Sequence, residues 1–432
     1  MTSMTNKERN MTEHIASETA ARRAFLGLTA GAAGLAGFAA FGAEGTSTAS
    51  PVPAVFSVRD LGAKGDGTTD DTDAVQAAVD GAVRAGGGRV HFPAGRYRLT
   101  RTITIASSDR LSLTGDGFCS VLLHAGPEHC IAWKEGCSCR EVTVRDLCVC
   151  AAGASKPLES AAIACLGGVE RSVFSQLLLT GDGDIRMGSG ILTREVADTT
   201  ALIQCVMWGV TGKGLEVARG SEVRLLGGRI VGFTRDEHKS VGVELTGNNG
   251  GVHILTTDII GLETAVKIGG GPGAPSNREI FITHATIDSC THGLVQTDNA
   301  YTSIAGCWAA SCDEEQILVE GRGAVLAVAG GTIFNGGAYG KPGAHNGMVV
   351  RGGSFTLSGL TIRHNKGTGI LVEGNVRDYT ITGCRIADNG RGAVLGGNNF
   401  VFSNNTLARN GVQLVDNGGK NKNTGGNVLT DK

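Results

Sequence analysis

The chain has 432 residues, a net charge of −2, and 68 glycines against 8 prolines. A net charge this close to zero argues against a nucleic-acid-binding protein, which would show a basic face, and no nucleic-acid motif is present. Glycine at about twice its ordinary share suits a chain with many tight turns between short strands.

Residues 1–49 are predicted to be a signal peptide and linker. The pair Arg22-Arg23 precedes an uncharged stretch, rich in Ala and Gly, that ends at Ala43. This arrangement resembles a twin-arginine export signal. We therefore expect export by that route to the periplasm or the extracellular space, with cleavage between Ala43 and Ala49 and no stable membrane insertion afterwards.

Twelve cysteines would normally suggest disulfides in an exported protein. The twin-arginine resemblance instead implies folding in a reducing cytoplasm. Cys148 and Cys150 would face the same side of a strand, as core residues do, and Cys137 and Cys139 are too closely spaced for a zinc knuckle. We expect buried thiols and no metal site.

Residues 50–110 are predicted to open the fold with an amphipathic helix. Apolar residues recur there at helical spacing; they are Ala74, Val75, Ala78, Val79 and Ala82. Asp70 or Asp71 is expected to cap the helix, because acidic side chains stabilise its positive end. We expect the helix to close one end of the repeats that follow, since an exposed terminal coil invites edge pairing.

The phrases on either side of this helix carry a family resemblance. Residues 56–73 read FSVRDLGAKGDGTTDDTD, and residues 86–99 read GGGRVHFPAGRYRL. They resemble the opening of the pectate-lyase superfamily, which includes rhamnogalacturonases, some glucanases and phage tailspikes. The resemblance implies a right-handed parallel β-helix with a polysaccharide as its partner, either a monomer or, as in related tailspikes, a homotrimer.

Residues 111–416 contain strand-like phrases that return every 21 to 31 residues. Each unit has three short apolar runs and almost no helical periodicity. A period of this length indicates a solenoid, and three strands per turn indicate a parallel β-helix. We predict an all-β, right-handed parallel β-helix of roughly 12 coils, followed by a disordered tail over residues 417–432.

Equivalent positions of successive coils should stack about 4.8 Å apart. One inward column ends in asparagines whose amides can bond one another; they are Asn365, Asn389 and Asn410. One outward column passes from carboxylates to an amine and then to apolar residues; it reads Glu216, Glu244, Lys267, Val295, Leu318, Val349 and Leu371. A neighbouring outward column is expected to form a surface salt ladder; it reads Glu320, Arg351 and Glu373.

The candidate site lies around the first outward column. Glu216 opposite Glu244 is unfavourable because like charges on adjacent strands repel, so either Lys267 bridges them or the pair has a function. Ionisable loops converge on the same edge, where His292 lies between acids and could transfer protons. The predicted catalytic residues are Glu216, Glu244, Lys267 and His292, and the predicted substrate-binding residues are Arg235, Asp236, His238, Glu263 and Glu315.

Several chemistries fit these residues, and each would make the protein a carbohydrate-active enzyme. A hydrolase would use Glu216 and Glu244 as its two carboxylates. A lyase would neutralise a uronate with Lys267 or Arg235 and remove a proton with His292, with room for Ca²⁺ on nearby carboxylates as its cofactor. A uronan epimerase shares that first step. The alternative from another class is a non-catalytic carbohydrate-binding or surface β-helix.

Overall fold

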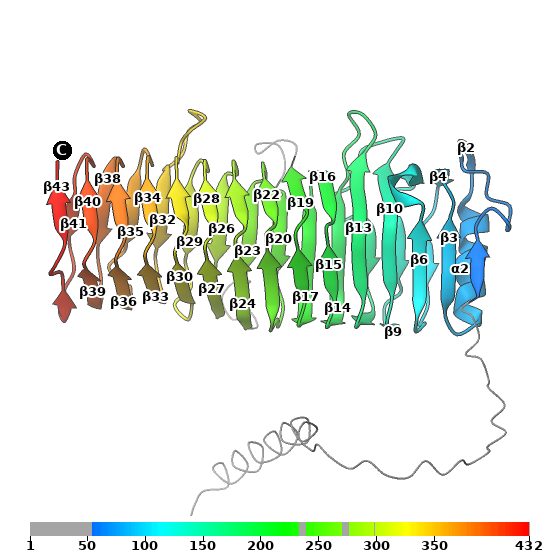
Figure 1. Cartoon of the computed structure of the whole chain (residues 1–432), viewed down its shortest axis with the longest axis horizontal. Coiled ribbons are helices and arrows are strands. Elements are labelled where there is room, and N and C mark those ends of the chain that lie inside the picture. The colour runs from blue at the N-terminus through cyan, green and yellow to red at the C-terminus, as the bar shows by residue number, and fades with distance from the viewer. Residues whose placement is uncertain (1–53, 233–238, 270–275, 298, 432) are drawn as a thin grey trace, which may run out of the picture. The chain divides into compact units, whose positions relative to one another are not determined.

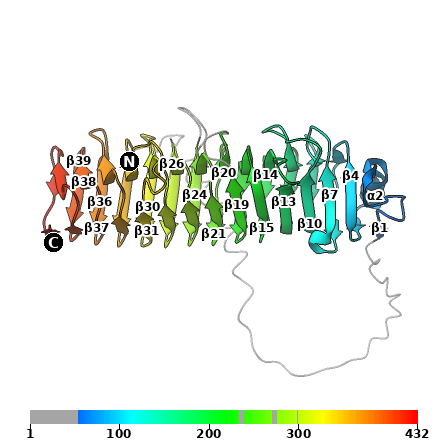
Figure 2. The same ribbon diagram turned by 90° about the horizontal axis from the view of Figure 1, so that it is seen from above.

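The computed structural model describes residues 54–232, 239–269, 276–297 and 299–431. Within them the chain winds as an elongated β-solenoid of about 14 turns. Its coils follow one another along a single axis from β1 (Val55–Ser57) to β43 (Val428–Thr430) (Figure 1; Figure 2, seen from above). The all-β solenoid predicted from the repeat is confirmed, and it has more turns than the sequence suggested.

Most coils contribute one strand to a 15-stranded sheet, on which the candidate site lies. The main path of this sheet consists of β5 (Ile103–Ile105), β8 (Ile131–Trp133), β11 (Ala161–Cys165), β14 (Ser189–Asp198), β17 (Lys213–Ser221), β20 (Val241–Leu245), β23 (Thr264–Ile268), β26 (His292–Gln296), β29 (Glu315–Val319), β32 (Asn346–Val350), β35 (Thr368–Val372), β38 (Arg391–Leu395) and β41 (Leu414–Asp416). Neighbouring strands of this path pair in parallel.

The remaining strands form a 28-stranded sheet with two rows along most of its length. From the middle of the solenoid onward, the first row contains β18 (Arg224–Leu226), β21 (Val252–Leu255), β24 (Asn277–Thr283), β27 (Ala300–Ala305), β30 (Val325–Ala329), β33 (Ser354–Ser358), β36 (Arg377–Thr382), β39 (Asn398–Ser403) and β42 (Lys422–Asn423). The second row contains β16 (Val206–Val210), β19 (Arg229–Gly232), β22 (Asp258–Ile260), β25 (Thr286–Asp288), β28 (Trp308–Ala310), β31 (Thr332–Phe334), β34 (Thr361–Arg363), β37 (Arg385–Ala387), β40 (Thr406–Ala408) and β43.

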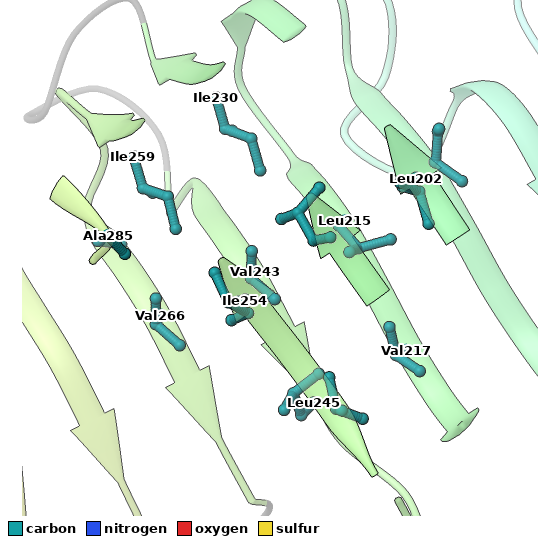
Figure 3. Packing of buried hydrophobic residues seen from close by; sticks show 14 of the residues in the cluster. Leu202, Leu215, Val217, Ile230, Val243, Leu245, Ile254, Ile259, Val266 and Ala285 are labelled. Atoms are coloured by element: carbon teal, nitrogen blue, oxygen red, sulfur yellow. The ribbon is translucent and has the colours of Figure 1, made fainter. Parts of the chain in front are cut away.

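The inward-facing residues of each coil fill the interior of the solenoid and form its core. Leu215 and Val217 on β17, Val243 and Leu245 on β20, and Val266 on β23 are all buried, as strand alternation predicts (Figure 3). Because these residues point inward, the residues between them belong to the outer face of the 15-stranded sheet. This register decides which side chains can form a site.

The opening helix α2 (Thr72–Arg84) forms where its periodicity predicts. It packs on β1, on β3 (Gly88–Phe92) and on β5, and it buries Val75, Ala78, Val79 and Ala82. Its role as a cap for the solenoid stays a prediction.

Of the two acidic residues predicted to cap α2, Asp70 bonds its first turn with its side chain and Asp71 does not. Asp71 occupies the N-cap position but makes no cap hydrogen bond with its side chain. Its carboxylate instead accepts the backbone N–H groups of Lys64, at 2.6 Å, and Gly65, at 3.0 Å. Asp70 accepts the N–H of Thr72 at 3.1 Å, and so it bonds the first turn of the helix. Asp71 therefore fixes the preceding loop rather than capping the helix.

The predicted asparagine ladder is confirmed. The Asn365 side-chain amide donates to Asn389 at 2.9 Å, and the Asn389 amide donates to Asn410 at 3.0 Å. A second ladder joins Asn405 to Asn427, where the Asn405 amide donates at 3.1 Å. Such bonds satisfy buried polar groups at the turns and fix the register between coils.

The expectation of a disordered tail over residues 417–432 is wrong for most of this segment. The strands β42 and β43 pair in parallel with β39 and β40. The side-chain amide of Asn427 bonds the preceding coil, since it accepts from Asn405 and donates to the carbonyl of Phe402. The solenoid therefore continues through the C-terminal residues.

All 12 cysteines are free thiols, and 11 of them are buried, in agreement with the core role expected for them. In the described part of the chain, no helix has the length and apolar character that a membrane crossing requires.

Candidate functional site

The outward column of the 15-stranded sheet has the predicted register. Glu216 on β17 lies opposite Glu244 on β20, which in turn lies opposite Lys267 on β23. The column continues through Val295 on β26 and Leu318 on β29. The column is therefore charged over three coils and apolar on the coils that follow.

The two glutamates are buried and bridged by a lysine that the sequence did not reveal. The Lys213 ammonium bonds both carboxylates, that of Glu216 at short range and that of Glu244 at 2.9 Å. Glu216 also accepts from Arg194 Nε at 3.2 Å, and Glu244 accepts from Lys267 at 2.9 Å. Each carboxylate thus has two cationic partners, which removes the repulsion expected between them.

These bonds determine which protonation state of the Glu244 carboxyl is favoured. Burial raises the pKa of its carboxyl, but hydrogen bonds from Lys267 and Lys213 outweigh burial and hold the pKa below its usual value. A glycosidase needs one carboxyl protonated as a general acid. The bonds of Glu244 oppose that state, and a catalytic role for Glu216 and Glu244 stays a prediction.

A groove opens next to this column, with a volume of about 560 Å³. Val295 and Leu318, which continue the outward column, contribute an apolar surface. Charged or polar residues contribute the rest; they include Lys239, Glu263, Lys267, His292, Glu314, Glu315, Glu320 and Arg351. An apolar surface among a few placed polar groups is the usual character of a small-molecule or sugar site.

A histidine–glutamate pair contributes to the lining of this groove. His292, the first residue of β26, and Glu315, the first residue of β29, occupy adjacent coils, and Nδ1 of His292 lies 2.8 Å from Oε2 of Glu315. An ionised carboxylate only accepts hydrogen bonds, so Nδ1 carries the proton of the neutral imidazole. Nε2 is then the nitrogen available to take a proton.

The environment of His292 favours its protonated form. The hydrogen bond that His292 donates to Glu315 raises the pKa of His292 most, burial opposes the rise, and the charges of Glu315, Glu263 and Glu314 add to it. The side chain of Glu315 is 6% exposed, against 29% for His292, so the carboxylate lies behind the ring. This is the arrangement of an oriented general acid or base.

Backbone bonds to neighbouring coils fix both residues of the pair. The N–H of His292 donates to the carbonyl of Glu263 at 2.8 Å, and the N–H of Glu314, beside Glu315, donates to the carbonyl of Thr291 at 2.9 Å. Before His292 the chain turns at Ser289, which has a positive φ of 58°. The turn lets Cys290 point into the core and His292 point out.

The structure brings together part of the predicted set. Lys267, His292, Glu263 and Glu315 line one groove. Glu244 lies beneath Lys267, and Glu216 lies one coil further away; neither of them lines the groove. The predicted residues Arg235, Asp236 and His238 lie outside the described residues.

Three residues near the site were missed or given a different role. Strict alternation would place Lys213 inward with Leu215, but Lys213 is the first residue of β17, and its ammonium reaches the outer face. The salt ladder through Arg351 is confirmed, with Glu320 at 2.6 Å and Glu373 at 3.3 Å. Arg351 and Glu320 also line the groove, which no sequence pattern indicated.

Two family models match parts of the chain. Residues 55–129 match the model described as rhamnogalacturonase A/epimerase, pectate lyase-like. Residues 273–429 match the model of the right handed beta helix region. The second match agrees with the right-handed solenoid expected from the sequence.

Known proteins share the opening or the fold. Alginate lyase 7 of Azotobacter vinelandii is 62% identical over 45 residues, which are 10% of this chain and 5% of that protein. Mannuronan C5-epimerase AlgE1 of the same organism is 49% identical over 70 residues, 15% of this chain and 5% of that protein. The matches therefore cover a small fraction of the length of these relatives.

A solved structure extends the likeness to the fold. The family 28 exopolygalacturonase of Yersinia enterocolitica superposes with a TM-score of 0.53 at 15% identity, covering 88% of this chain and 78% of that one. At this identity the likeness concerns the β-helix fold alone. The chain thus joins a pectate-lyase-like opening, over residues 55–129, to a right-handed parallel β-helix.

Proposed function

We propose that the protein acts on a uronate-containing polysaccharide, and that its reaction begins with removal of the proton next to the uronate carboxylate. The observation that carries the proposal is the His292–Glu315 pair on a groove that also holds Lys267 and Arg351. A cation beside the sugar carboxylate would stabilise the charge that develops when the proton leaves. Neutral Nε2 of His292 would take that proton.

Two outcomes of this first step fit the groove. If the bond to the glycosidic oxygen at C4 breaks, the carbanion electrons form a double bond and the product is an unsaturated sugar, as in a lyase. If a proton returns to the opposite face, the product is the epimer. Both outcomes agree with the named activities of the two relatives that share part of the sequence.

A hydrolase is the weaker candidate. It would need a protonated carboxyl beside the sugar. Of the two predicted carboxylates, Glu244 is held ionised by two lysines and Glu216 bonds Lys213 and Arg194, and neither lines the groove. The apolar surface and the charged groups of the groove would also suit binding without reaction, so the test must separate chemistry from binding.

The test is incubation with alginate, polygalacturonate and a neutral glucan. We expect ultraviolet absorbance from an unsaturated uronate, or deuterium incorporation from D₂O next to the carboxylate without cleavage. His292→Gln should lower the rate by about a hundredfold or more. His253→Gln is a matched control, because His253 lies on β21 in the other sheet and stacks on Phe281.

Three results would contradict the proposal. New reducing ends without unsaturation or deuterium would indicate a hydrolase. Full activity in His292→Gln would remove the proposed base. Binding without any reaction on the three polymers would favour the non-catalytic alternative.

We propose export by the twin-arginine route on the basis of Arg22 and Arg23. Replacing both with lysine should retain the protein in the cytoplasm, as fractionation of the cells would show. Unchanged export would mean a different route.

A further inference from the structure

The outer face of the second row carries aromatic rings on three consecutive coils. Trp308 on β28 lies 5.3 Å from Phe334 on β31, measured between ring centroids. Phe334 lies 5.5 Å from His364, which follows β34. The three coils extend over two intervals of about 4.8 Å each. We call Trp308, Phe334 and His364 the aromatic cluster.

Trp308 is 41% exposed, and the part of the side chain that faces solvent is the apolar ring. Its indole N–H donates to Oδ2 of Asp288 at 3.2 Å, so its polar atom is satisfied within the protein. The other oxygen of Asp288 accepts from the Ser289 hydroxyl at 2.7 Å. Asp288 therefore orients the indole and leaves the hydrocarbon part of the ring to solvent.

The turn between β31 and β32 connects the aromatic cluster to the groove. Tyr339 on this turn bonds the Ser289 hydroxyl at 2.8 Å, two coils back, so the turn passes the level of Trp308. At its other end, Ala344 N–H donates at 3.0 Å to Glu314, which lines the groove. One turn, between β31 and β32, thus bonds residues beside the aromatic cluster at one point and a residue of the groove at another.

A cation lies at the far end of the aromatic cluster. The guanidinium of Arg363, which can only donate, lies 2.6 Å from Nε2 of His364. Arg363 also lies 3.5 Å from Asp388, whose carboxylate is already bound by Arg409 at 2.7 Å. The rim of the aromatic cluster therefore offers a positive charge and several hydrogen-bonding groups.

We propose that the aromatic cluster is a second carbohydrate subsite, which binds uronate units of the polymer that flank the reacting unit. Exposed rings stack on the C–H face of a sugar, and a polar rim fixes its orientation. Contiguous exposed aromatic surface with a polar rim is uncommon on a surface without a binding role. The proposal that the sugar is a uronate rests on the proposed function. The proposal that the aromatic cluster stacks on a sugar rests on the rings alone.

The test is a fluorescence titration with oligomannuronate and oligogalacturonate in the His292→Gln background, which prevents turnover. The chain has three tryptophans, and Trp133 is buried. Sugar binding should quench the Trp308 emission. Trp308→Ala should raise Kd about tenfold, whereas Trp308→Phe, which keeps a ring, should retain most of the affinity.

Trp208 provides the matched control. It is 46% exposed on β16, on the same row but four coils from Trp308. Trp208→Ala should leave Kd and the quenching unchanged. With His292 restored, Trp308→Ala should raise KM and leave kcat within about twofold, because the aromatic cluster contributes binding but does not touch the reacting atoms.

The outcomes separate this inference from the proposed function. If Trp308→Ala and Trp208→Ala bind both oligomers as tightly as the parent, the subsite is refuted, whatever the activity. If the unsubstituted protein turns over no uronan but shows Trp308-dependent binding, the subsite stands and the proposed function falls. Equal quenching by a neutral cello-oligosaccharide would refute the preference for uronate.

Discussion

Lys213→Met tests whether the buried glutamates hold the coils together or serve chemistry. The side chains of Lys213, Glu216 and Glu244 are 24%, 8% and 7% exposed, respectively. Without the ammonium, two carboxylates roughly 5 Å apart would repel by about 3 kcal/mol at an effective dielectric constant of about 20. Breaking a buried ion pair costs about 3–5 kcal/mol, and Arg194 and Lys267 still offset part of it. We therefore expect a loss of about 3 kcal/mol.

The assay is urea unfolding at pH 7, followed by circular dichroism. Glu244→Gln should destabilise the wild type, because it removes a partner of Lys213, but should stabilise the Lys213→Met variant, because it removes the repulsion. Arg219→Met is the control, since Arg219 and Glu195 form an exposed pair at 2.9 Å that should contribute less than about 1 kcal/mol. The reasoning is refuted if Lys213→Met unfolds at the wild-type midpoint, or if Glu244→Gln destabilises both backgrounds equally.

Two further predictions concern the histidine pair and the asparagine ladder. Glu315→Gln removes the carboxylate whose charged hydrogen bond raises the pKa of His292. If His292 is the base, the acidic limb of the kcat/KM profile should move to lower pH, and an unmoved limb would contradict that role. The same raised pKa means that protonation of His292 stabilises the fold below about pH 6.5 and that this contribution is lost as pH rises through the folded pKa. Asn389→Ala removes four hydrogen bonds made by the side chain and should cost about 4 kcal/mol at about 1 kcal/mol each. The exposed control Asn375→Ala should cost little, and equal unfolding midpoints would show that the ladder does not stabilise the coils.

The periodicity of the sequence was sufficient to predict the fold and to predict which residues form the outward column. Alternation placed Glu216, Glu244 and Lys267 in one column, and that register is confirmed because each coil repeats the same inward positions. Comparison of adjacent coils also placed His292 among acidic residues, and one of them, Glu315, accepts its hydrogen bond. In a solenoid each repeat contacts only the repeats beside it, so aligning the repeats predicts which residues are neighbours in space.

The predictions were wrong or incomplete at residues whose contacts the repeat pattern does not determine. Lys213 lies at a strand start, where alternation no longer fixes its direction. Asp71 precedes a helix, yet loop N–H groups compete for its carboxylate and prevail. Asn427 belongs to the segment predicted to be a disordered tail, although its amide bonds the coil before it. Composition and local preference do not report on such long-range partners.

The position of the groove follows from a change within one column. At Glu216 and Glu244 the outward position carries charges that are paired and buried, so this part of the sheet is closed to a ligand. From Val295 to Leu318 the same position is apolar and cannot bind the neighbouring cations, so Lys267 and His292 line an open groove there. An apolar surface beside ionisable walls can receive the face of a sugar ring while its carboxylate meets a cation. Two side-chain classes at one repeating position thus separate coils closed by buried ion pairs from coils that carry an open groove.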